Sequence, residues 1–453
     1  MDIYADSPIL PERLRYTSGA ACNVAGKWVV YRMQASVRTE QNLALSEACR
    51  ISRLLDKPLK IVFHLNAAFP EANYRHFLFL AQGLSEVAAW CYQQSIPFEY
   101  LTGDFKTALE ALLPDTSCLI SDRGYLRVQR EQSDWLRTRF GDSFIEVEDN
   151  LIVPVESASS KREWAARTLR PKLEAKMPYF TDSSSRSFAI PPITTAVGPD
   201  TAEKQRQILS LFLEEVRHRN YLSPVDRRGG QAVARQLLET FATRKLDGYA
   251  HNRNYPELAA TSCLSAYLHF GMISPLTICW RLQTLAGAAP FIEQLLVRRE
   301  LAHNYIYYTP AYSDYEALPA WARDTLGEHQ SDRRPHLYTL AQLENAQTED
   351  ACWNAAMREM VATGYMENTM RMYWGKKIIE WSETAPLAFR NMLYLNNRYF
   401  LDGRDANSYA GVGWCFGLHD RPWQSRPVFG TVRYMNEAGL RRKYDMARYI
   451  DRF

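Results

Sequence analysis

Short apolar runs alternate with longer amphipathic stretches along the first 150 residues of the chain. The runs are rich in Val, Ile, Phe and Tyr, a composition that is typical of buried β-strands. They lie at residues 27–33, 59–65, 97–101, 117–122 and 144–148. The stretches between them place apolar residues at helical spacing, so that predicted strands and helices alternate. This order predicts an α/β fold with a mainly parallel, doubly wound sheet.

The pattern changes after a polar stretch, TDSSSRSFAIPPITTAVGPD, at residues 181–200. Its abundance of Ser, Thr and Pro is typical of a linker. From about residue 203 the sequence indicates helices joined by loops, with few strand-like runs. We therefore expect four parts, which are an N-terminal extension at 1–25, an α/β domain at 26–180, a linker at 181–202 and an all-helical domain at 203–453.

Composition excludes several classes of protein. The chain has 453 residues, enough for two or three domains, and its net charge of +3 neither favours nor excludes nucleic acid as a partner. No stretch reaches about 18 uncharged apolar residues, and the N-terminus lacks the features of a signal peptide. Eight cysteines form no CxxC pair, and there is no histidine cluster. We expect a cytoplasmic protein with free thiols and with neither a membrane span nor a metal site.

The strongest candidate for phosphate binding lies in the second half of the chain. No GxGxxG or GxxxxGK[ST] pattern occurs, so a standard dinucleotide or P-loop site is not predicted. Residues 248–274, GYAHNRNYPELAATSCLSAYLHFGMIS, place many hydroxyl and amide groups before a predicted helix. Ser262, Ser265 and nearby backbone N–H groups could bind phosphate oxygens there. N-capping of a packed helix explains the same pattern.

A polar loop at residues 396–414, NNRYFLDGRDANSYAGVGW, is rich in Asn, Asp and Gly. Its Asp402 could pair with Arg371 if the chain brings the two together. A buried ion pair is costly and adds little stability, so a pair here would suggest a ligand that needs it. A redox-active ring whose charge changes is one such ligand.

Three tryptophans form a further pattern. Trp374 and Trp381 are seven residues apart in MRMYWGKKIIEW, so they share one helix face at an axial separation of roughly 10 Å. Trp353 precedes them on another predicted helix. Each could be an ordinary core residue. Together they could form a chain for electron transfer, because indole is among the side chains that are most easily oxidised.

Several motifs resemble, in the same order, those of the photolyase/cryptochrome flavoproteins. The closest likeness is to class II cyclobutane pyrimidine dimer photolyases. In the second half the motifs are TSCLSAYLHFGMIS, WNAAMREMVATGYMENTMRMYWGKKIIEW, LNNRYFLDGRDANSYAGVGW and HDRPW, and in the first half VVYRMQASVRTEQNLAL and EWAARTLRPKL. The likeness covers nearly the whole chain apart from about the first 25 residues and the linker.

The resemblance implies a flavoenzyme that repairs DNA with light. An antenna-type α/β domain would precede an all-α domain that holds FAD in a bent, U-shaped form. The partner would be DNA containing a pyrimidine dimer, which is flipped out of the duplex. An electron from photoexcited reduced FAD would split the cyclobutane ring and then return. The antenna chromophore could be a deazaflavin or a folate, or the protein could lack one. We expect the protein to be a monomer.

The resemblance also assigns roles to individual residues. Trp374 would lie nearest the flavin, Trp353 in the middle and Trp381 at the outer end of an electron-transfer chain. Asn396 would face flavin N5, beside the Arg371–Asp402 pair. The residues expected around the FAD phosphates are Tyr249, Ser262, Leu264 and Ser265. Those expected at the lesion or the DNA are Arg253, Met372 and Trp414.

The chain departs from the class II pattern at the predicted lesion site. That class carries a glutamate, which contacts the thymine carbonyls, and four residues later a tryptophan that stacks on the dimer. The ungapped register of FIEQLLVRRELAHNY places Gln294 and Arg298 there, whereas Glu293 is one residue away and Glu300 lies farther along. The MENT at 366–369 also departs from the pattern. These differences weaken the prediction of efficient repair but not that of FAD binding.

Two interpretations follow. One is a light-driven lyase that splits pyrimidine dimers in DNA. The other is a cryptochrome-like photoreceptor that keeps the flavin and the tryptophans but repairs weakly or not at all. The chain ends at RYIDRF directly after the predicted helical domain, without a long signalling tail, which favours the lyase. A flavin-independent α/β metabolic enzyme would not explain the set of motifs.

Overall fold

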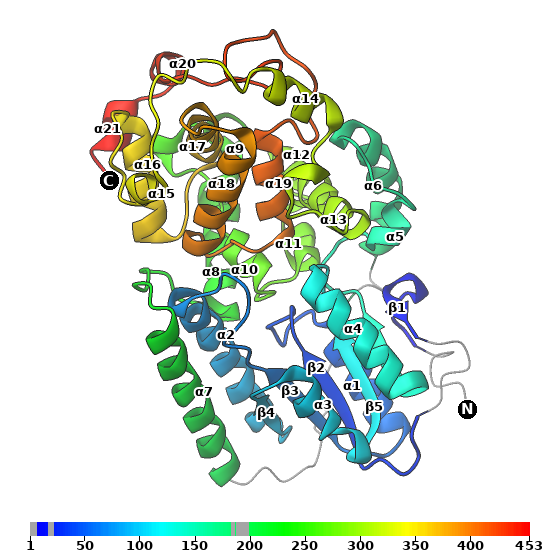
Figure 1. Cartoon of the computed structure of the whole chain (residues 1–453). Coiled ribbons are helices and arrows are strands. Elements are labelled where there is room, and N and C mark those ends of the chain that lie inside the picture. The colour runs from blue at the N-terminus through cyan, green and yellow to red at the C-terminus, as the bar shows by residue number, and fades with distance from the viewer. Residues whose placement is uncertain (1–6, 17–21, 183–185, 187–198) are drawn as a thin grey trace.

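The computed structural model describes residues 7–16, 22–182, 186 and 199–453. Most of the predicted linker and part of the predicted N-terminal extension lie outside these residues. Figure 1 shows a sheet with flanking helices at one end of the molecule and a large group of helices at the other. This arrangement confirms the predicted fold class.

The described residues form a six-stranded sheet in the order β1-β6-β5-β2-β3-β4. The strands are β1 Leu14–Arg15, β2 Trp28–Met33, β3 Leu59–His64, β4 Phe98–Leu101, β5 Thr116–Asp122 and β6 Phe144–Val147. Neighbouring strands are parallel except for β1, which is antiparallel to β6. The order is doubly wound, with β3 and β4 on one side of β2 and β5 and β6 on the other. The five parallel strands match the five predicted runs.

Helices cover both faces of the sheet, because alternate strand residues point to opposite faces. They are α1 Leu43–Leu54, α2 Tyr74–Gln93, α3 Phe105–Glu110 and α4 Arg127–Phe140. On one face Val30 and Leu119 pack with Leu136 of α4. On the other face Val29 and Ile120 belong to a larger core that includes apolar residues of α1 and α2.

The remaining helices follow along the chain, and most of them form the helical part. These are α5 Val155–Ala158, α6 Ala166–Phe180, α7 Pro199–Arg219, α8 Gln231–Arg244, α9 Leu246–Asn252, α10 Ser265–His269, α11 Pro275–Leu282, α12 Ala289–Ile292, α13 Arg299–Tyr308, α14 Ala320–Glu328, α15 Leu340–Glu344, α16 Ala351–Thr363, α17 Asn368–Glu380, α18 Ala385–Tyr399, α19 Ala406–Cys415, α20 Glu437–Lys443 and α21 Met446–Ile450. A π-helix, Glu293–Arg298, joins α12 to α13. Within the described ranges no helix is both long and apolar enough to cross a membrane.

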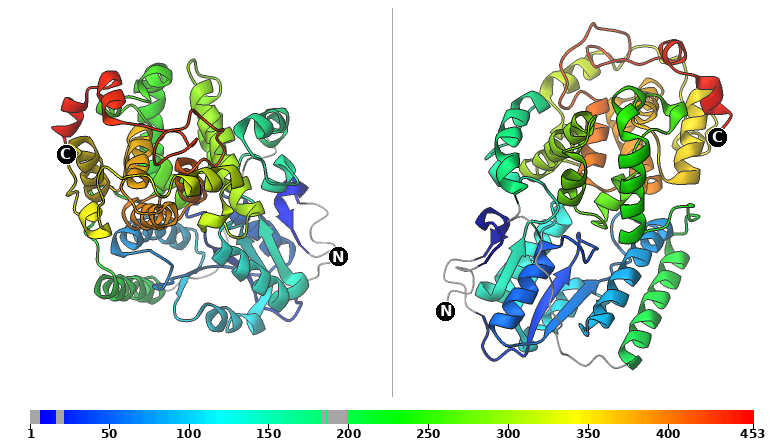
Figure 2. Two further views of the ribbon diagram at one scale, coloured as in Figure 1. Left: turned by 45° about the horizontal axis from the view of Figure 1, so that its top comes forward. Right: turned by 180° about the vertical axis from the view of Figure 1, so that it is seen from behind.

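The chain crosses between the two parts more than once. Helices α5 and α6 contact the helical part through α13 and the π-helix. Helix α7 then lies along α2 and β4 of the sheet part, as both views in Figure 2 agree. The helices flanking the predicted linker therefore pack against opposite parts of the molecule. The predicted limits of the domains stay a prediction.

A tight junction holds the two parts together. Gly271, between α10 and α11, has φ +67°, and a Cβ built on it would lie 1.8 Å from the carbonyl oxygen of Ala35, just after β2. The buried guanidinium of Arg38 donates to the carbonyl oxygen of Gly271 (2.9 Å) and to Oδ1 of Asn150 (2.9 Å). A glycine is required at this contact, because any side chain would push the two backbones apart.

Candidate functional site

Helical segments of the second part surround a cavity of about 560 Å³. Its wall is formed by the segment before α10, the π-helix, and parts of α13, α17, α18 and α19. Figure 1 shows α17, α18 and α19 at the centre of this part. Most of the predicted site residues line the cavity, namely Arg253, Ser262, Leu264, Ser265, Gln294, Arg298, Arg371, Met372, Trp374, Asn396, Asp402 and Trp414. The fold thus gathers residues that are up to 161 positions apart, from 253 to 414, around one space.

The predicted phosphate segment turns sharply at the cavity wall. Cys263 has φ +56°, a left-handed conformation that is uncommon for residues other than glycine. Next to it, the N–H of Leu264 donates to Oγ of Ser262 (3.4 Å), and Ser265 begins α10. Turns that alternate left- and right-handed conformations expose successive N–H groups, an arrangement that binds anions.

Tyr249 lies behind this wall and does not border the cavity. It is buried between the rings of Phe241 and Phe291, with centroids 5.4 Å away in each case, and burial raises its pKa. Arg253 does border the cavity, and its guanidinium lies 5.5 Å from the Tyr249 ring centroid. Tyr249 therefore supports Arg253, and its predicted phosphate contact stays a prediction.

The predicted ion pair is present at the cavity. Nη2 of Arg371 donates to both carboxylate oxygens of Asp402, at 3.1 and 3.0 Å. The guanidinium also stacks 3.8 Å from the ring centroid of Phe400, so the pair has one defined position. Nearby, Asn396 is buried, and its Nδ2 donates to Oδ1 of Asn397 (3.0 Å). A fixed charge pair and a fixed amide thus border the same space.

The three tryptophans form a continuous path that leads away from the cavity. Trp374 is 2% exposed and borders the cavity, and its indole N–H has no hydrogen-bond partner among the described residues. The indole N–H of Trp353 donates to the carbonyl oxygen of Trp374 (3.0 Å). The rings of Trp353 and Trp381 meet edge to face, with centroids 5.5 Å apart. From the cavity outward the residues thus lie in the order Trp374, Trp353 and Trp381, and their role in electron transfer stays a prediction.

Trp381 itself does not reach the surface, because it is only 3% exposed. Its ring meets that of Tyr338 edge to face, with centroids 5.1 Å apart, and Tyr338 is partly exposed. The path to solvent therefore continues through a tyrosine that sequence analysis missed. No sequence signal identifies Tyr338, because it lies in a loop between α14 and α15, far from the tryptophan motif.

The residues at the departure from the class II pattern are the ones that reach the cavity. Gln294 and Arg298 both line it from the π-helix, and the Arg298 side chain is 53% exposed. Glu293 is directed to cations instead, with Arg170 at 2.6 Å and Arg298 at 3.2 Å. Glu300 is buried and accepts a hydrogen bond from the N–H of Ile152 (2.6 Å). Neither glutamate borders the cavity, so a slip of register would not supply the missing carboxyl group.

A different carboxyl group does border the cavity. Glu367, just before α17, is 4% exposed, and burial raises its pKa. One of its oxygens accepts a hydrogen bond from Thr261 Oγ1 (3.1 Å), and the other has no partner within the described chain. In the sequence, the MENT segment at 366–369 stands out only as a departure from the class II pattern. The sequence signal that could have identified Glu367 is its place directly before the predicted helix that carries Arg371 and Trp374.

A second cavity, of about 140 Å³, lies at the carboxyl ends of β2 and β3. Residues 32–35 and 63–66 form one side, and His269, Phe270 and Arg404 of the helical part form another. Doubly wound sheets bind ligands at this edge. The residues that form this cavity cannot be identified from the sequence, because its walls come from segments that only the packed fold brings together.

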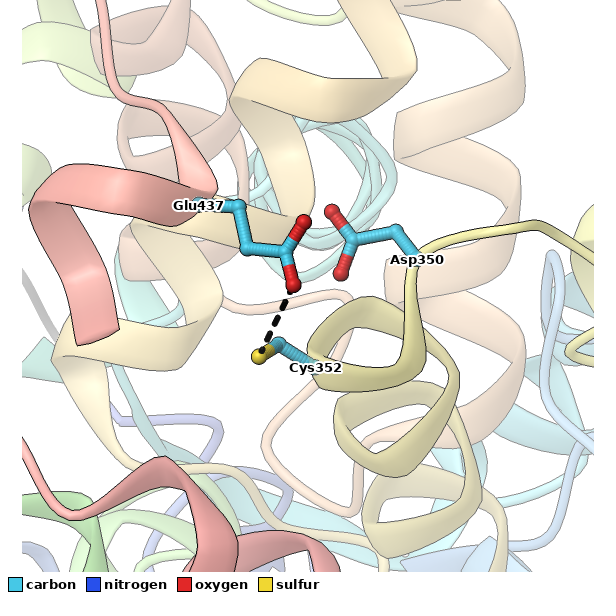
Figure 3. Close-up of side chains that lie close together, drawn as sticks. All are labelled: Asp350, Cys352 and Glu437. Atoms are coloured by element: carbon cyan, nitrogen blue, oxygen red, sulfur yellow. Dashed lines mark hydrogen bonds between the residues drawn. The ribbon is translucent and has the colours of Figure 1, made fainter.

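Three side chains of types that can bind metals lie close together, those of Asp350, Cys352 and Glu437 (Figure 3). Asp350 accepts hydrogen bonds from the N–H of Trp353 and the hydroxyl of Tyr373. Glu437 pairs with Arg441 at 2.7 Å, and burial raises the pKa of Cys352 to about 12. These protein partners account for the group, and we assign no metal to it.

The chain is similar to a family of known proteins along most of its length. The DNA photolyase family model matches residues 29–189. A protein of Methanothermobacter thermautotrophicus named deoxyribodipyrimidine photo-lyase is 41% identical, over 97% of this chain and 98% of its own length. One of the same name from Arabidopsis thaliana is 36% identical, over 93% of this chain and 88% of its own length.

A solved structure agrees at the level of the fold. The photolyase of Sulfolobus tokodaii superposes with a TM-score of 0.70 at 16% identity, covering 94% of this chain and 90% of that one. That similarity extends over both parts of the molecule. The identity to the named relatives along nearly the whole chain shows that this protein belongs to the DNA photolyase family.

Proposed function

We propose that this protein is a light-driven DNA lyase that splits cyclobutane pyrimidine dimers by electron transfer from photoexcited reduced FAD. The observation that carries the proposal is the single cavity that combines the Arg371–Asp402 pair, the predicted phosphate segment and Trp374. The tryptophan path begins at the same wall. The relatives named deoxyribodipyrimidine photo-lyase support the substrate class.

The residues present fit FAD. Ser262, Leu264 and Ser265 would hold the phosphates, and Arg371, Asp402 and Asn396 would border the flavin ring. Two buried polar atoms without partners in the described chain, Nε1 of Trp374 and Oε2 of Glu367, also call for a ligand in this space. The bound cofactor supplies the photoexcited electron. The Sulfolobus tokodaii structure is described as holding two FAD molecules, which agrees with this assignment.

The protein's own residues provide positioning and electron supply. The successive contacts of Tyr338 with Trp381, Trp381 with Trp353 and Trp353 with Trp374 would give a route by which electrons reach Trp374 from the surface. Arg371, held by Asp402 and Phe400, keeps a fixed pair of opposite charges beside the space for the ring. Such preorganised charges stabilise a developing charge without reorganisation.

The cavity mouth carries features for binding DNA. Arg253 and Arg298 border it and can contact phosphates. Met372 and Trp414 line it and can enclose a flipped dimer. Farther along, Trp423 is an exposed aromatic residue with the guanidinium of Arg433 4.1 Å from its ring centroid. Exposed aromatic rings among cations are typical of surfaces that bind unpaired bases.

We also propose that the second cavity takes an antenna chromophore. Its apolar wall includes Phe63, Phe69, Phe77 and Phe270, and its polar wall includes Arg32. These side chains offer aromatic faces and a cation at the edge where doubly wound sheets bind ligands. The test is energy transfer to bound FAD after addition of a deazaflavin or a folate to the purified protein. The absence of both binding and transfer for each pigment would contradict the assignment.

The proposed function is tested by cofactor content and by repair. FAD should copurify with the wild type, and Asp402→Asn should lose much of it, because Arg371 would remain unpaired. Glu437→Gln, which breaks an exposed ion pair instead, should keep it. The loaded, photoreduced protein should remove dimers from DNA only in blue light. Normal FAD binding without any repair would favour the photoreceptor, which the departures at Gln294 and Arg298 keep as the second candidate.

A further inference from the structure

Trp414, a wall residue of the large cavity, lies close to two cations. Nζ of Lys376 is 5.5 Å from the centroid of its ring, and the guanidinium carbon of Arg433 is 5.4 Å from it. Both distances lie within the roughly 6 Å range of cation–π interactions. Arg433 is paired with Asp420 at 2.9 Å, so its charge is offset. Lys376 forms no ion pair within the described residues.

The position of Lys376 is unusual for a charged group. Its side chain is 0% exposed, and Nζ donates to the carbonyl oxygen of Cys415 (2.5 Å), the residue after Trp414. Burying an ammonium group without a carboxylate partner costs free energy, so stability alone does not explain it. What the charge faces is the indole of Trp414.

The next residue along the same helix offers a direct contrast. Nζ of Lys377 is 5.2 Å from the ring centroid of Trp381. That ammonium group pairs with Glu380 at 2.6 Å and lies 3.8 Å from Asp350. The positive charge beside Trp381 is therefore offset by two carboxylates, whereas the charge of Lys376 beside Trp414 is not.

The contrast matters because two indoles border the same cavity. Trp374 connects through Trp353 to Trp381, so an electron taken from it can be replaced from farther along the path. Trp414 has no aromatic partner in the part of the chain that the structure describes. An electron taken from Trp414 could only return from the flavin, and the light energy would be lost.

We propose that Lys376 makes Trp414 a poor electron donor and thereby directs photoreduction to Trp374. The inference rests on the proposed function, because it requires flavin in the cavity. The suppressed step is a one-electron transfer, in which Trp414 loses an electron to photoexcited oxidised flavin and becomes a radical cation. No bond forms or breaks, and no proton moves. A fixed ammonium group opposes this step because the product places a second positive charge beside it.

Trp414 can then serve as a wall for the substrate without competing for the excited flavin. The effect of Lys376 on Trp414 should also depend on pH. Burial lowers the pKa of Lys376 to about 8, with opposing effects from Cys415 and Asp420 and a further lowering by Arg433. Above that pH the ammonium group loses its charge, and Trp414 should become easier to oxidise.

The test uses the excited-state lifetime of bound oxidised FAD in a Trp374→Phe background, where the main donor is absent. Lys376→Met keeps a long, unbranched side chain in the buried site and removes the charge. We expect the lifetime to shorten several-fold in the Trp374→Phe/Lys376→Met protein. Adding Trp414→Phe should restore the long lifetime, because the quencher is then gone. Lys377→Met in the same background is the matched control and should leave the lifetime unchanged.

A second measurement covers the case in which Lys376→Met does not fold. The lifetime of the Trp374→Phe protein should fall as the pH rises from about 6.5 to about 9.5, across the pKa of about 8. In the Trp374→Phe/Trp414→Phe protein it should not. An unchanged lifetime in both experiments, with FAD bound, would overturn the inference and leave the proposed function intact. Failure of all variants and of the wild type to bind FAD would instead contradict the proposed function.

Discussion

At the scale of single residues, Trp374 connects the cavity to the row of three tryptophans that we propose as the electron path. It borders the cavity, its carbonyl oxygen receives the indole N–H of Trp353, and its own indole N–H has no partner in the described chain. Phenylalanine would fill most of the same volume but is much harder to oxidise. A substitution of phenylalanine at this position therefore tests electron transfer with little change in packing.

Trp374→Phe should slow photoreduction of bound oxidised FAD by at least an order of magnitude. Electrons from Trp353 would have to bypass the missing indole. Absorption spectra under continuous blue light measure the rate. Trp90→Phe, in α2 of the sheet part, is a control that removes an indole outside the path. Photoreduction at the wild-type rate in Trp374→Phe would show that electrons take another route.

Several residues of the site could be predicted, and others could not, for physical reasons. The Arg371–Asp402 pair and the order of the three tryptophans were expected from the resemblance of their motifs to those of photolyases, and the structure brings these residues together. Whether a residue is buried depends on what packs over it. Sequence analysis therefore missed that Trp381 is covered by Tyr338.

At the scale of elements, the π-helix Glu293–Arg298 decides which side chains meet the substrate space. Its extra residue per turn widens the helix, and π-helices are frequent at functional sites. Here it directs Gln294 and Arg298 to the cavity and leaves Glu293 with Arg170. The proposed lesion contacts, Gln294 and Arg298, therefore depend on this element.

The double variant Gln294→Glu/Arg298→Trp should bind a dimer-containing oligonucleotide more tightly than the wild type. A tryptophan platform adds stacking of about 1–3 kcal/mol per base. Losing the cation should also make binding less dependent on salt. Dimer affinity and repair yield across a salt series measure both effects, with undamaged DNA of the same sequence as control. If neither quantity changes and the wild type repairs fully, these positions are not lesion contacts.

The junction of α16 with α21 should make stability depend on pH. Glu359 is buried, accepts a hydrogen bond from the hydroxyl of Tyr449, and has its pKa raised to about 7, mainly by burial. The folded protein therefore binds this proton more tightly than the unfolded chain does. The resulting stabilisation is present below about pH 4.5 and is lost as the pH rises to about 7, by at most about 3 kcal/mol.

Glu359→Gln should flatten this decline, because the amide cannot titrate. The free energy of unfolding between about pH 5 and about pH 8, measured with urea at fixed FAD concentration, gives the slope. Exposed Glu328→Gln is the control and should keep the wild-type slope. An equal slope in Glu359→Gln and the wild type would contradict the assignment.

The strands show what an element needs in order to be predicted. The five parallel strands were found because each is a continuous apolar run between polar turns. β1 was missed because its two residues, Leu14 and Arg15, are too few to form a pattern. The π-helix was missed because its residues have the same apolar spacing as the α-helices beside it.

At the scale of the whole molecule, the site depends on how the two parts are joined. The second cavity lies between them, with walls from the sheet edge and from His269 and Arg404. Gly271 sets the closest approach of the two backbones. Sequence patterns report each part separately, so neither this junction nor the second cavity could be predicted from them.

Gly271→Ala should lower the free energy of unfolding by at least about 2 kcal/mol, because it combines a steric overlap with strain at positive φ. Gly327→Ala in α14 is the matched control. A Cβ there would meet nothing within 4 Å, so stability should be unchanged or slightly higher. Urea denaturation of the two variants provides the comparison. Equal midpoints for Gly271→Ala and the wild type would show that the junction can relax.

FAD bound in the large cavity is proposed to split pyrimidine dimers in light. The most direct measurement is the number of dimers removed from an oligonucleotide, per bound FAD, by chemically reduced protein in blue light and in darkness. Many turnovers in light and none in darkness are expected, for the wild type and equally for Trp374→Phe, because chemical reduction bypasses the tryptophan path. Protein that is loaded with reduced FAD and binds the damaged DNA, but removes no dimers in light, would contradict the claim.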